Sequence, residues 1–302
     1  MGEEDLRTFY YLTHKKHGRE IYFKNNYEAI KFLEPKFNSF KKKGVYLLLQ
    51  FGILQPFLSK IKLPKEFGDV ILVAEKINCF NLNKKEVLSF QRDKNLSKEF
   101  IRSKKFQKKM ASKGFAPKVY EINEKIPYSK EELLEVFNRG SRYEIFKKIN
   151  KLYRNNGINK IPIKKYTSKI MKELKKRGIN DVFLRDKLNE FSKKKMNLLV
   201  TFLHGDFAME NILVRKKQEK REIVFTDYHP YNGLITNSLV NYFYITEDIQ
   251  SSKYFKQVIG AFPKEVQKNI KIYLILSEID LVANKGKSLL VAVRRIKKHL
   301  SH

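Results

Sequence analysis

The chain has 302 residues, 42% hydrophobic and 13% aromatic, which is long and apolar enough for one large domain or two lobes and favours a folded chain over a disordered one. Its single cysteine, Cys79, excludes an intrachain disulfide, and no Cys/His spacing typical of a metal site occurs. With 63 Lys and Arg against 32 Asp and Glu, the formal net charge is +31, which disfavours polycationic partners and favours phosphate-bearing ones.

The first part of the chain combines strand-like runs with one helical stretch. A helix is expected over Tyr27–Lys43, ended or kinked at Pro35. The apolar stretch Val45–Leu58 is too short to span a bilayer and is predicted to form one or two buried strands or a core helix, with Val45–Phe51 favoured as a strand. Residues 1–5 lack the basic flank and apolar run of a signal peptide, so we expect a cytoplasmic protein without a transmembrane segment.

Strands are next expected at Val70–Ala74, Val87–Phe90 and Lys118–Ile122, with a helix over Lys98–Lys113 before the last of them. From residue 129 onward the pattern is mostly helical. Ser129 resembles a helix cap, and the remaining expected helices are Glu144–Tyr153, Tyr166–Lys176, Asp186–Met196, Ser238–Ile245, Val266–Val282 and the basic Ser288–His299. These patterns predict an N-terminal extension and small lobe over residues 1–122 and a mainly helical lobe over 123–302.

The most informative stretch is His204-Gly205-Asp206, followed five positions later by Asn211. Two apolar runs, Ile212–Val214 and Ile223–Phe225, then predict a short β-hairpin that ends at residue 227. Such a hairpin brings its two ends together. We therefore expect the side chains of residues 206, 211 and 227 to lie close to one another.

Asp206, Asn211 and Asp227 have the chemistry that a magnesium–triphosphate site needs. Phosphoryl transfer depends mostly on positioning and charge neutralisation, and Mg²⁺ prefers oxygen ligands. Asn211 and Asp227 would supply such oxygens, and Asp206 would orient an acceptor hydroxyl and take its proton. Gly205 permits a backbone conformation closed to other residues, and His204 would brace the loop. The alternative, that these are ordinary turn residues between buried strands, is weaker because the combination rarely arises by chance.

The motif resembles the catalytic loop and metal-binding Asp of the aminoglycoside phosphotransferase and choline kinase family, a branch of the protein-kinase-like fold. The resemblance covers roughly residues 85–245 and is specific around 203–227. It implies an α+β, bilobal protein with a small mixed-sheet lobe and a larger, mainly helical lobe. It also implies ATP as donor, Mg²⁺ as cofactor, Asp206 as catalytic base and Asn211 and Asp227 as magnesium ligands. Glu99 falls where the family keeps the Glu that pairs with a phosphate-binding Lys.

Three departures from the family pattern concern the nucleotide. Ser89 occupies the place of the strand Lys that contacts ATP, so Arg92, Lys94 or Lys76 would have to substitute. The Gly-rich phosphate loop is missing, since Gly68 is the only glycine between residues 52 and 114. The segment 123–128 is too short for an obvious fifth strand and adenine hinge.

The sequence therefore predicts an ATP- and Mg²⁺-dependent phosphotransferase that acts on a hydroxyl of a small-molecule or glycan-like, anionic acceptor. Two alternatives stay open at this point. One is a degenerate kinase-like basic scaffold that binds nucleic acid or an acidic membrane surface, and the other is an atypical protein kinase in an RNA-associated assembly. The high Lys content has two explanations of equal weight, an AT-rich coding bias and an anionic partner.

Overall fold

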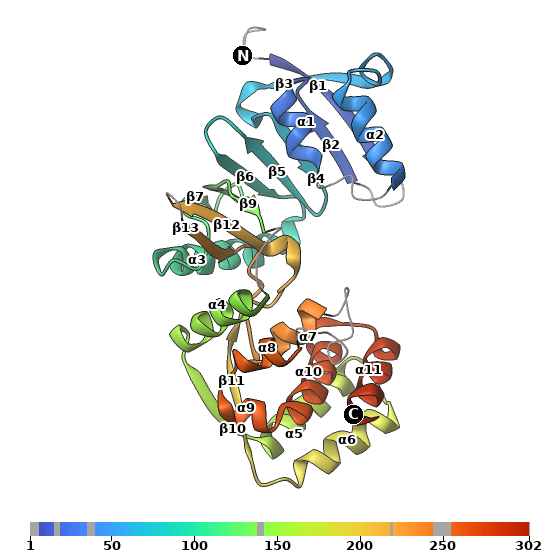
Figure 1. Ribbon diagram of the computed structural model, residues 1–302, viewed down its shortest axis with the longest axis vertical. Helices are drawn as coiled ribbons and strands as arrows, with labels where there is room; N and C mark the ends of the chain where they lie inside the picture. The colour runs from blue at the N-terminus through green and yellow to red at the C-terminus, as the bar shows by residue number, and fades with distance from the viewer. Residues whose placement is uncertain are drawn as a thin grey trace. The chain divides into compact units, whose positions relative to one another are not determined.

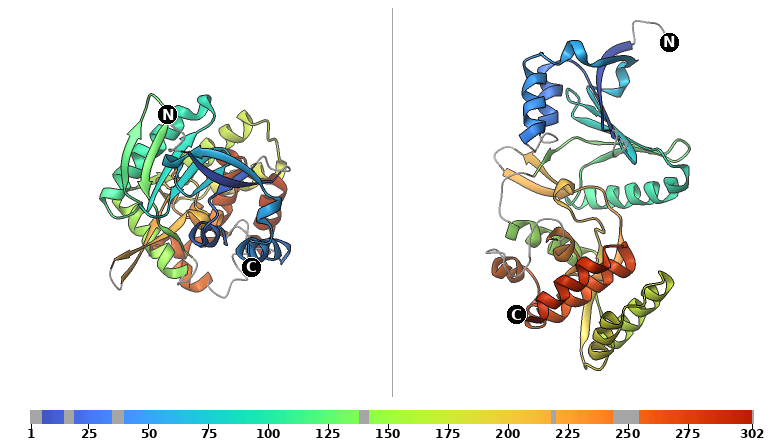
Figure 2. Two further views of the ribbon diagram at one scale, coloured as in Figure 1. Left: turned by 90° about the horizontal axis from the view of Figure 1, so that it is seen from above. Right: turned by 90° about the vertical axis from the view of Figure 1, so that its right-hand side faces the viewer.

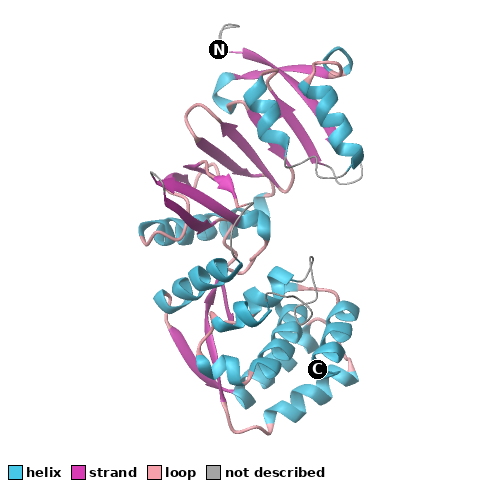
Figure 3. Cartoon of the chain, viewed as in Figure 1, coloured by secondary structure: helices cyan, strands magenta, loops and turns pink. Residues whose placement is uncertain are grey.

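The structure is a computed structural model that describes residues 6–14, 19–34, 40–137, 142–217, 220–243 and 255–301. The chain forms two compact units, Met1–Glu135 and Val136–His302. Strands dominate the first unit and helices the second (Figure 3). This confirms the predicted α+β class. The predicted division at residues 122 and 123 differs from this one because the strand Tyr128–Glu132 pairs within the first unit.

The first unit is built on an antiparallel sheet whose described strands follow the order β3-β1-β2-β4-β5-β6-β8-β7 (Figure 1). The strands are β1 (Leu6–His14), β2 (Arg19–Phe23), β3 (Ser59–Pro64), β4 (Val70–Val73), β5 (Lys76–Asn81), β6 (Glu86–Gln91), β7 (Val119–Asn123) and β8 (Tyr128–Glu132). Successive residues of a strand face opposite sides, so the sheet has two apolar faces. One face holds the core around Phe23 and Val70, and the other holds the core around Phe9 and Ile71.

Helices α1 (Tyr27–Leu33) and α2 (Phe40–Gln50) contribute to the core around Phe23 and Val70. The prediction of a strand over Val45–Phe51 is wrong, because most of this run lies in α2. A helix turns only part of an apolar run inward. Leu49 is buried, whereas Leu47 is 50% exposed and Leu48 is 38% exposed.

Helix α3 (Ser97–Ser112) packs on β7 and confirms the predicted helix over Lys98–Lys113. The predicted helix start at Ser129 is wrong, since residues 128–132 form β8, paired with both β6 and β7. The strand is hard to recognise because the two side chains that it buries, Ser129 and Glu131, are polar. The segment 123–128 closes the β7–β8 hairpin, with Asn123 paired to Tyr128 and a turn over 124–127, so a further strand does follow at this point.

The second unit contains two small sheets. β11 (Asn197–Leu203) lies between β10 (Ile158–Pro162) and β14 (Tyr231–Leu234), and β12 (Ile212–Lys217) lies between β13 (Lys220–Phe225) and the short β9 (Glu135–Val136). The described helices are α4 (Arg142–Asn155), α5 (Ile163–Lys176), α6 (Val182–Ser192), α7 (Asn237–Phe243), α8 (Phe255–Gly260), α9 (Lys264–Lys268), α10 (Ile270–Lys285) and α11 (Leu289–Ser301).

Helix α10 is the central helix of this unit, because every residue of the run 273–283 is buried. It packs against α5, α7 and α11, and Figure 2 shows α10 and α11 side by side. The predicted helix over Glu144–Tyr153 is confirmed by α4, which buries Ile145, Phe146, Ile149 and Leu152. The helix predicted over Asp186–Met196 begins earlier, where the Asp181 side chain accepts the N–H of Leu184 at 2.9 Å. Over the described residues, no helix combines the length and the apolar character needed to cross a bilayer.

Candidate functional site

The predicted hairpin is present and places residues 211 and 227 at the same end. β12 and β13 pair in antiparallel register from Ile212 opposite Phe225. Beyond this pair the Thr226 N–H donates to the Asn211 carbonyl at 3.0 Å. Asp227 is the next residue. The pairing of two short strands therefore fixes the backbone on which both predicted magnesium ligands sit.

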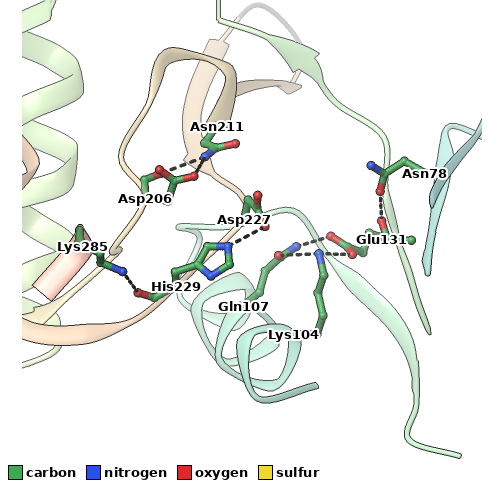
Figure 4. A network of polar contacts seen from close by, with 10 residues as sticks. Asn78, Lys104, Gln107, Glu131, Asp206, Asn211, Asp227, His229 and Lys285 are labelled. Carbon is green, nitrogen blue, oxygen red and sulfur yellow. Dashed lines mark hydrogen bonds and ion pairs between the residues drawn. The ribbon is translucent and has the colours of Figure 1, made fainter. Parts of the chain in front are cut away.

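Asn211 is joined directly to Asp206. Its amide nitrogen Nδ2 donates to the Asp206 backbone carbonyl at 3.0 Å and to the carboxylate oxygen Oδ2 at 3.1 Å (Figure 4). Asn211 is buried, while Asp206 is only half-buried. Because both contacts use the amide nitrogen, the amide oxygen Oδ1 of Asn211 is left to accept or to coordinate.

Asp227 lies just beyond the hairpin, and its backbone has a φ of +55°. A left-handed conformation is uncommon for a residue other than glycine, although Asp tolerates it better than most, and it is often found at functional sites. The carboxylate is 33% exposed, with Oδ1 3.5 Å from Nε2 of His229. Figure 4 shows Asp206, Asn211 and Asp227 gathered around the end of the hairpin.

Gly205 sets the path of the loop. Its φ is +90°, and a Cβ at this position would lie 1.7 Å from the carbonyl oxygen of His229. The two chain segments also share a hydrogen bond, because the His229 N–H donates to the His204 carbonyl at 2.9 Å. Only glycine permits both this conformation and this close approach.

His204 is fully buried beneath the loop. Its ring lies 4.2 Å from that of Tyr228, centroid to centroid, and the rings of Phe207 and Phe225 approach it edge-on. Burial lowers the pKa of the imidazole to about 3, with the nearby Asp227 carboxylate opposing the shift. His204 is therefore neutral near pH 7 and supports the loop by packing and main-chain contacts.

The oxygens at this site match what Mg²⁺ requires. The Asn211 Oδ1 atom and the Asp227 carboxylate come from adjoining ends of one hairpin, and Mg²⁺ commonly takes one or two protein oxygens while phosphates and waters complete its octahedron. Within the described ranges, no cluster of three or more His, Cys, Asp or Glu side chains forms a closed metal site. The residues fit an ion that nucleotide phosphates share.

The predicted nucleotide-side residues all lie in the first unit, at or near the surface. Glu99 is exposed in the first turn of α3, and Lys76 is half-exposed at the start of β5. Arg92 is exposed and donates through Nη1 to the Ala74 carbonyl at 3.0 Å. Ser89 is buried and donates through Oγ to Oδ1 of Asn78 at 2.7 Å. Position 89, where the predicted resemblance led us to expect a phosphate-binding Lys, is thus a buried serine that hydrogen-bonds within the protein.

A buried polar network in the first unit was not predicted. The Lys104 ammonium on α3 lies 2.6 Å from Oε1 of Glu131 on β8, and both side chains are about 95% buried. Gln107 and Ser129 each donate to the same carboxylate at 2.5 Å (Figure 4). In this pair the helix supplies the Lys and the strand supplies the Glu. The one signal in the sequence is spacing, because Lys104 and Gln107 follow Phe100 at the i+4 and i+7 positions of the buried helix face.

Comparisons with known proteins give structural likenesses only. No protein-family model and no curated protein sequence matches the chain. Among solved structures, it is similar to an ethanolamine kinase of Plasmodium vivax, with 17% identity over 91% of this chain and 92% of that one and a TM-score of 0.45.

Choline kinase LicA of Streptococcus pneumoniae has 12% identity over 76% of this chain and 89% of that one, with a TM-score of 0.47. Aminoglycoside 2'-phosphotransferase-IIIa has 10% identity over 76% and 88%, with a TM-score of 0.46. The predicted resemblance to these kinases is confirmed as a likeness. With TM-scores below 0.5 it carries no further conclusion, and the function must be argued from the side chains themselves.

Proposed function

We propose that the protein is a phosphotransferase that moves the γ-phosphoryl group of ATP to a hydroxyl of a small-molecule acceptor. The observation that carries the proposal is the double hydrogen bond from the Asn211 amide to Asp206, at the hairpin end that also bears Asp227. This contact orients both side chains before any ligand binds. Preorganised groups of this kind supply most of the catalysis in phosphoryl transfer.

The roles of the three side chains follow from their chemistry. Mg²⁺ shared with the nucleotide phosphates would be held by Oδ1 of Asn211 and the carboxylate of Asp227. Asp206 would align the acceptor hydroxyl and accept its proton. A new bond forms between the acceptor oxygen and the γ-phosphorus, the bond from that phosphorus to the bridging oxygen of ADP breaks, and ADP leaves with the electron pair.

A second candidate is a degenerate member that binds nucleotide weakly and serves as a basic scaffold. Ser89 and its bond to Asn78 favour this candidate, as does the Lys104 ammonium that pairs with Glu131. Both observations concern residues of the first unit that a nucleotide-binding protein would be expected to use for the phosphates of ATP. The arrangement of Asp206 and Asn211 disfavours it, because a site without a function has no need of an oriented amide. A cytoplasmic location and a nucleic-acid or membrane partner stay predictions from composition and charge.

Thermal melts with nucleotide separate the two candidates. Mg·ATP at saturating concentration should raise the melting temperature of the wild type, because a ligand at about one hundred times its Kd adds about 2.7 kcal/mol. Asp227→Asn should lose this shift, and Asp206→Asn should keep it while losing ADP release. Asp186→Asn, an exposed carboxylate on α6, is the matched control and should behave as the wild type. A wild type that Mg·ATP does not stabilise at millimolar concentration would rule out the enzyme.

A further inference from the structure

Asp280 is a buried carboxylate of α10 that has no part in the proposed phosphoryl transfer. The residue is 2% exposed. Its Oδ1 atom accepts from the amide nitrogen of Asn284, one turn further along the same helix, at 2.6 Å, and its Oδ2 atom accepts from the amide nitrogen of Asn237, the first residue of α7. Burying a carboxylate is unfavourable unless its oxygens are hydrogen-bonded. Two neutral amides therefore stabilise a negative charge inside the second unit.

Asp280 determines which way the Asn237 side chain points. An ionised carboxylate only accepts hydrogen bonds, so Asn237 must turn its amide nitrogen, and not its oxygen, towards Asp280. The same nitrogen donates to the Tyr231 hydroxyl at 3.0 Å. The packing leaves little room for another arrangement, because a Cβ on Gly233 would lie 2.7 Å from this nitrogen and 2.9 Å from Cε2 of Tyr231. Asp280 thereby fixes Asn237, which in turn fixes the Tyr231 side chain.

Tyr231 lies against the strand that leads to the proposed base. In the β11–β14 ladder it pairs with Leu203, the last residue of β11, which lies three residues before Asp206. The side chains pack closely as well, since a Cβ on Gly233 would also lie 2.8 Å from Cδ1 of Leu203. The contacts of Asp280 therefore reach the main chain immediately before the loop.

A second connection runs through Lys285, the last residue of α10. Its ammonium lies 4.5 Å from the centre of the Tyr231 ring and donates to the His229 carbonyl at 3.4 Å (Figure 4). A Cβ on Gly205 would lie 1.7 Å from that carbonyl oxygen, and Asp206 is the next residue. Helix α10 is thus connected to the loop at a second point, next to the proposed base.

We infer that Asp280 is a positioning residue that holds the loop in the conformation in which Asp206 can take the proton of an acceptor hydroxyl. It acts through Asn237 and Tyr231. The inference rests on the proposed function and adds a residue that acts on the base without touching substrate or metal. The negative charge of Asp280 fixes the Asn237 amide, so loss of this charge should slow turnover, because a misplacement of about 1 Å can cost about two orders of magnitude in rate.

The charge of Asp280 changes within an experimentally accessible pH range. Burial raises the pKa of this carboxylate to about 6, against the hydrogen bonds from its two amide partners. The titratable groups that face it are Tyr166 and Lys169 of α5 and Tyr231 of β14, and burial raises the pKa of both tyrosines well above its usual value. Asp280 is therefore mostly ionised at pH 7 and mostly protonated at pH 5.

Amide hydrogen exchange, followed by mass spectrometry on the full-length protein, tests the positioning without any activity. The amides of Ala208 and Asn211 donate to main-chain carbonyls at 3.2 and 3.1 Å and so report on the order of the loop. Asp280→Asn removes the charge at nearly constant volume, and residues 203–211 should then exchange at least about tenfold faster than in the wild type. Tyr231→Phe removes the hydroxyl that links the buried amide to the loop. It should accelerate exchange of the same segment, and it carries the test if Asp280→Asn does not fold.

Steady-state ADP release supplies the second measurement. In Asp280→Asn, kcat should fall about tenfold at pH 7 while the KM for ATP stays unchanged. The difference should shrink at pH 5, where Asp280 of the wild type is protonated as well. Glu278→Gln is the matched control, because Glu278 is a second buried carboxylate of α10 whose Oε1 lies 2.6 Å from Nε of Arg295 on α11. It should keep the loop exchange, the kcat and the pH profile of the wild type.

Three results would overturn the inference. The first is unchanged exchange over residues 203–211 in both Asp280→Asn and Tyr231→Phe. The second is a ratio of variant to wild-type kcat that stays constant from pH 7 to 5, and the third is an equal effect in Glu278→Gln. In each case a wild type that Mg·ATP stabilises in the thermal melt keeps the proposed function. A wild type that shows neither this stabilisation nor ADP release removes the proposed function and the role of Asp280 with it.

Discussion

The side-chain amide of Asn211 gives both of its donor contacts to Asp206, at 3.0 Å to the backbone carbonyl and 3.1 Å to the carboxylate. One residue thereby holds the proposed base in place and turns its own oxygen outward. The relationship explains why a carboxylate cannot replace the amide here. A second carboxylate would remove the donor and place a like charge beside Asp206.

Asn211→Asp should therefore fold and yet fail as an enzyme. The variant retains an oxygen for the metal but loses both hydrogen bonds, so we expect ADP release to fall by two orders of magnitude or more, as is typical when a positioned group is lost. Titrating Mg²⁺ at fixed ATP checks the cause. A variant whose turnover recovers fully at high Mg²⁺ would show that Asn211 serves the metal alone.

Asp206→Asn isolates the proton transfer. The amide keeps an oxygen for the acceptor hydroxyl but cannot take its proton, so kcat should fall by roughly 10²–10⁴-fold with little change in the KM for ATP. The measurement is steady-state ADP release with a panel of small hydroxyl-bearing acceptors. Wild-type turnover in this variant would exclude Asp206 as the base.

The sequence was sufficient for the hairpin and the loop that bear the proposed site. Local rules determine both, since the runs Ile212–Val214 and Ile223–Phe225 have room only for a tight hairpin. The long helices of the second unit were also predictable, because α4 and α5 repeat apolar residues at helical spacing. An apolar pattern that repeats within one helix or strand can be recognised from the sequence without knowing which elements pack against it.

The rest depends on contacts between distant residues. β8 has a polar sequence because its buried Glu131 is paired with Lys104 and Gln107 of α3 and its buried Ser129 donates to Glu131. The pattern of β8 itself does not reveal these partners. Strands β1, β2 and β3 were missed for a similar reason. Their alternation of apolar and polar residues is short and becomes recognisable only once the strand order of the sheet is known. The contact between Lys285 and the His229 carbonyl was likewise not predicted, because the two residues lie 56 positions apart and are brought together by the packing of α10.

Gly205→Ala should disrupt the loop far more than another glycine substitution in a similar conformation. At Gly205 the added methyl meets the His229 carbonyl at 1.7 Å, whereas at Gly157, with a φ of +82°, nothing lies within 4 Å. Gly157→Ala should cost only the backbone strain, about 1 kcal/mol. Gly205→Ala should cost at least about 3 kcal/mol. Urea unfolding of both variants measures the difference, and equal losses would contradict the close approach at Gly205.

His204 should make the stability of the second unit depend on pH in the acid range. Its folded pKa of about 3 lies below the usual value of 6.5, so the unfolded chain takes up a proton first as the pH falls. The contribution of His204 to the free energy of unfolding is complete above about pH 6.5. It is lost as the pH falls towards 3, by at most about 1.4 kcal/mol per pH unit. His204→Leu should remove this contribution to the pH dependence of the unfolding free energy, measured by urea unfolding between pH 7 and 5. An unchanged slope would mean that the imidazole is accessible to protons.

The Lys104–Glu131 pair should dominate the electrostatic stability of the first unit, and the adjacent Lys105 provides the control. Lys104→Ala leaves a buried carboxylate without its partner and should cost about 3–5 kcal/mol. Lys105 pairs with Glu124 at 2.7 Å, but both side chains are more than half exposed, so Lys105→Ala should cost less than about 1 kcal/mol.

Acid titration tests the same pair independently. Burial alone would raise the pKa of Glu131, yet the Lys104 ammonium and the hydrogen bonds from Ser129 and Gln107 lower it below its usual value. A lowered pKa means that the stabilisation is present above the unfolded value of about 4.3 and is lost as the pH falls through the folded value. Glu131→Gln should remove this acid-dependent loss along with the ion pair. If Lys104→Ala and Lys105→Ala unfold at the same urea concentration at pH 7, the network does not stabilise the unit.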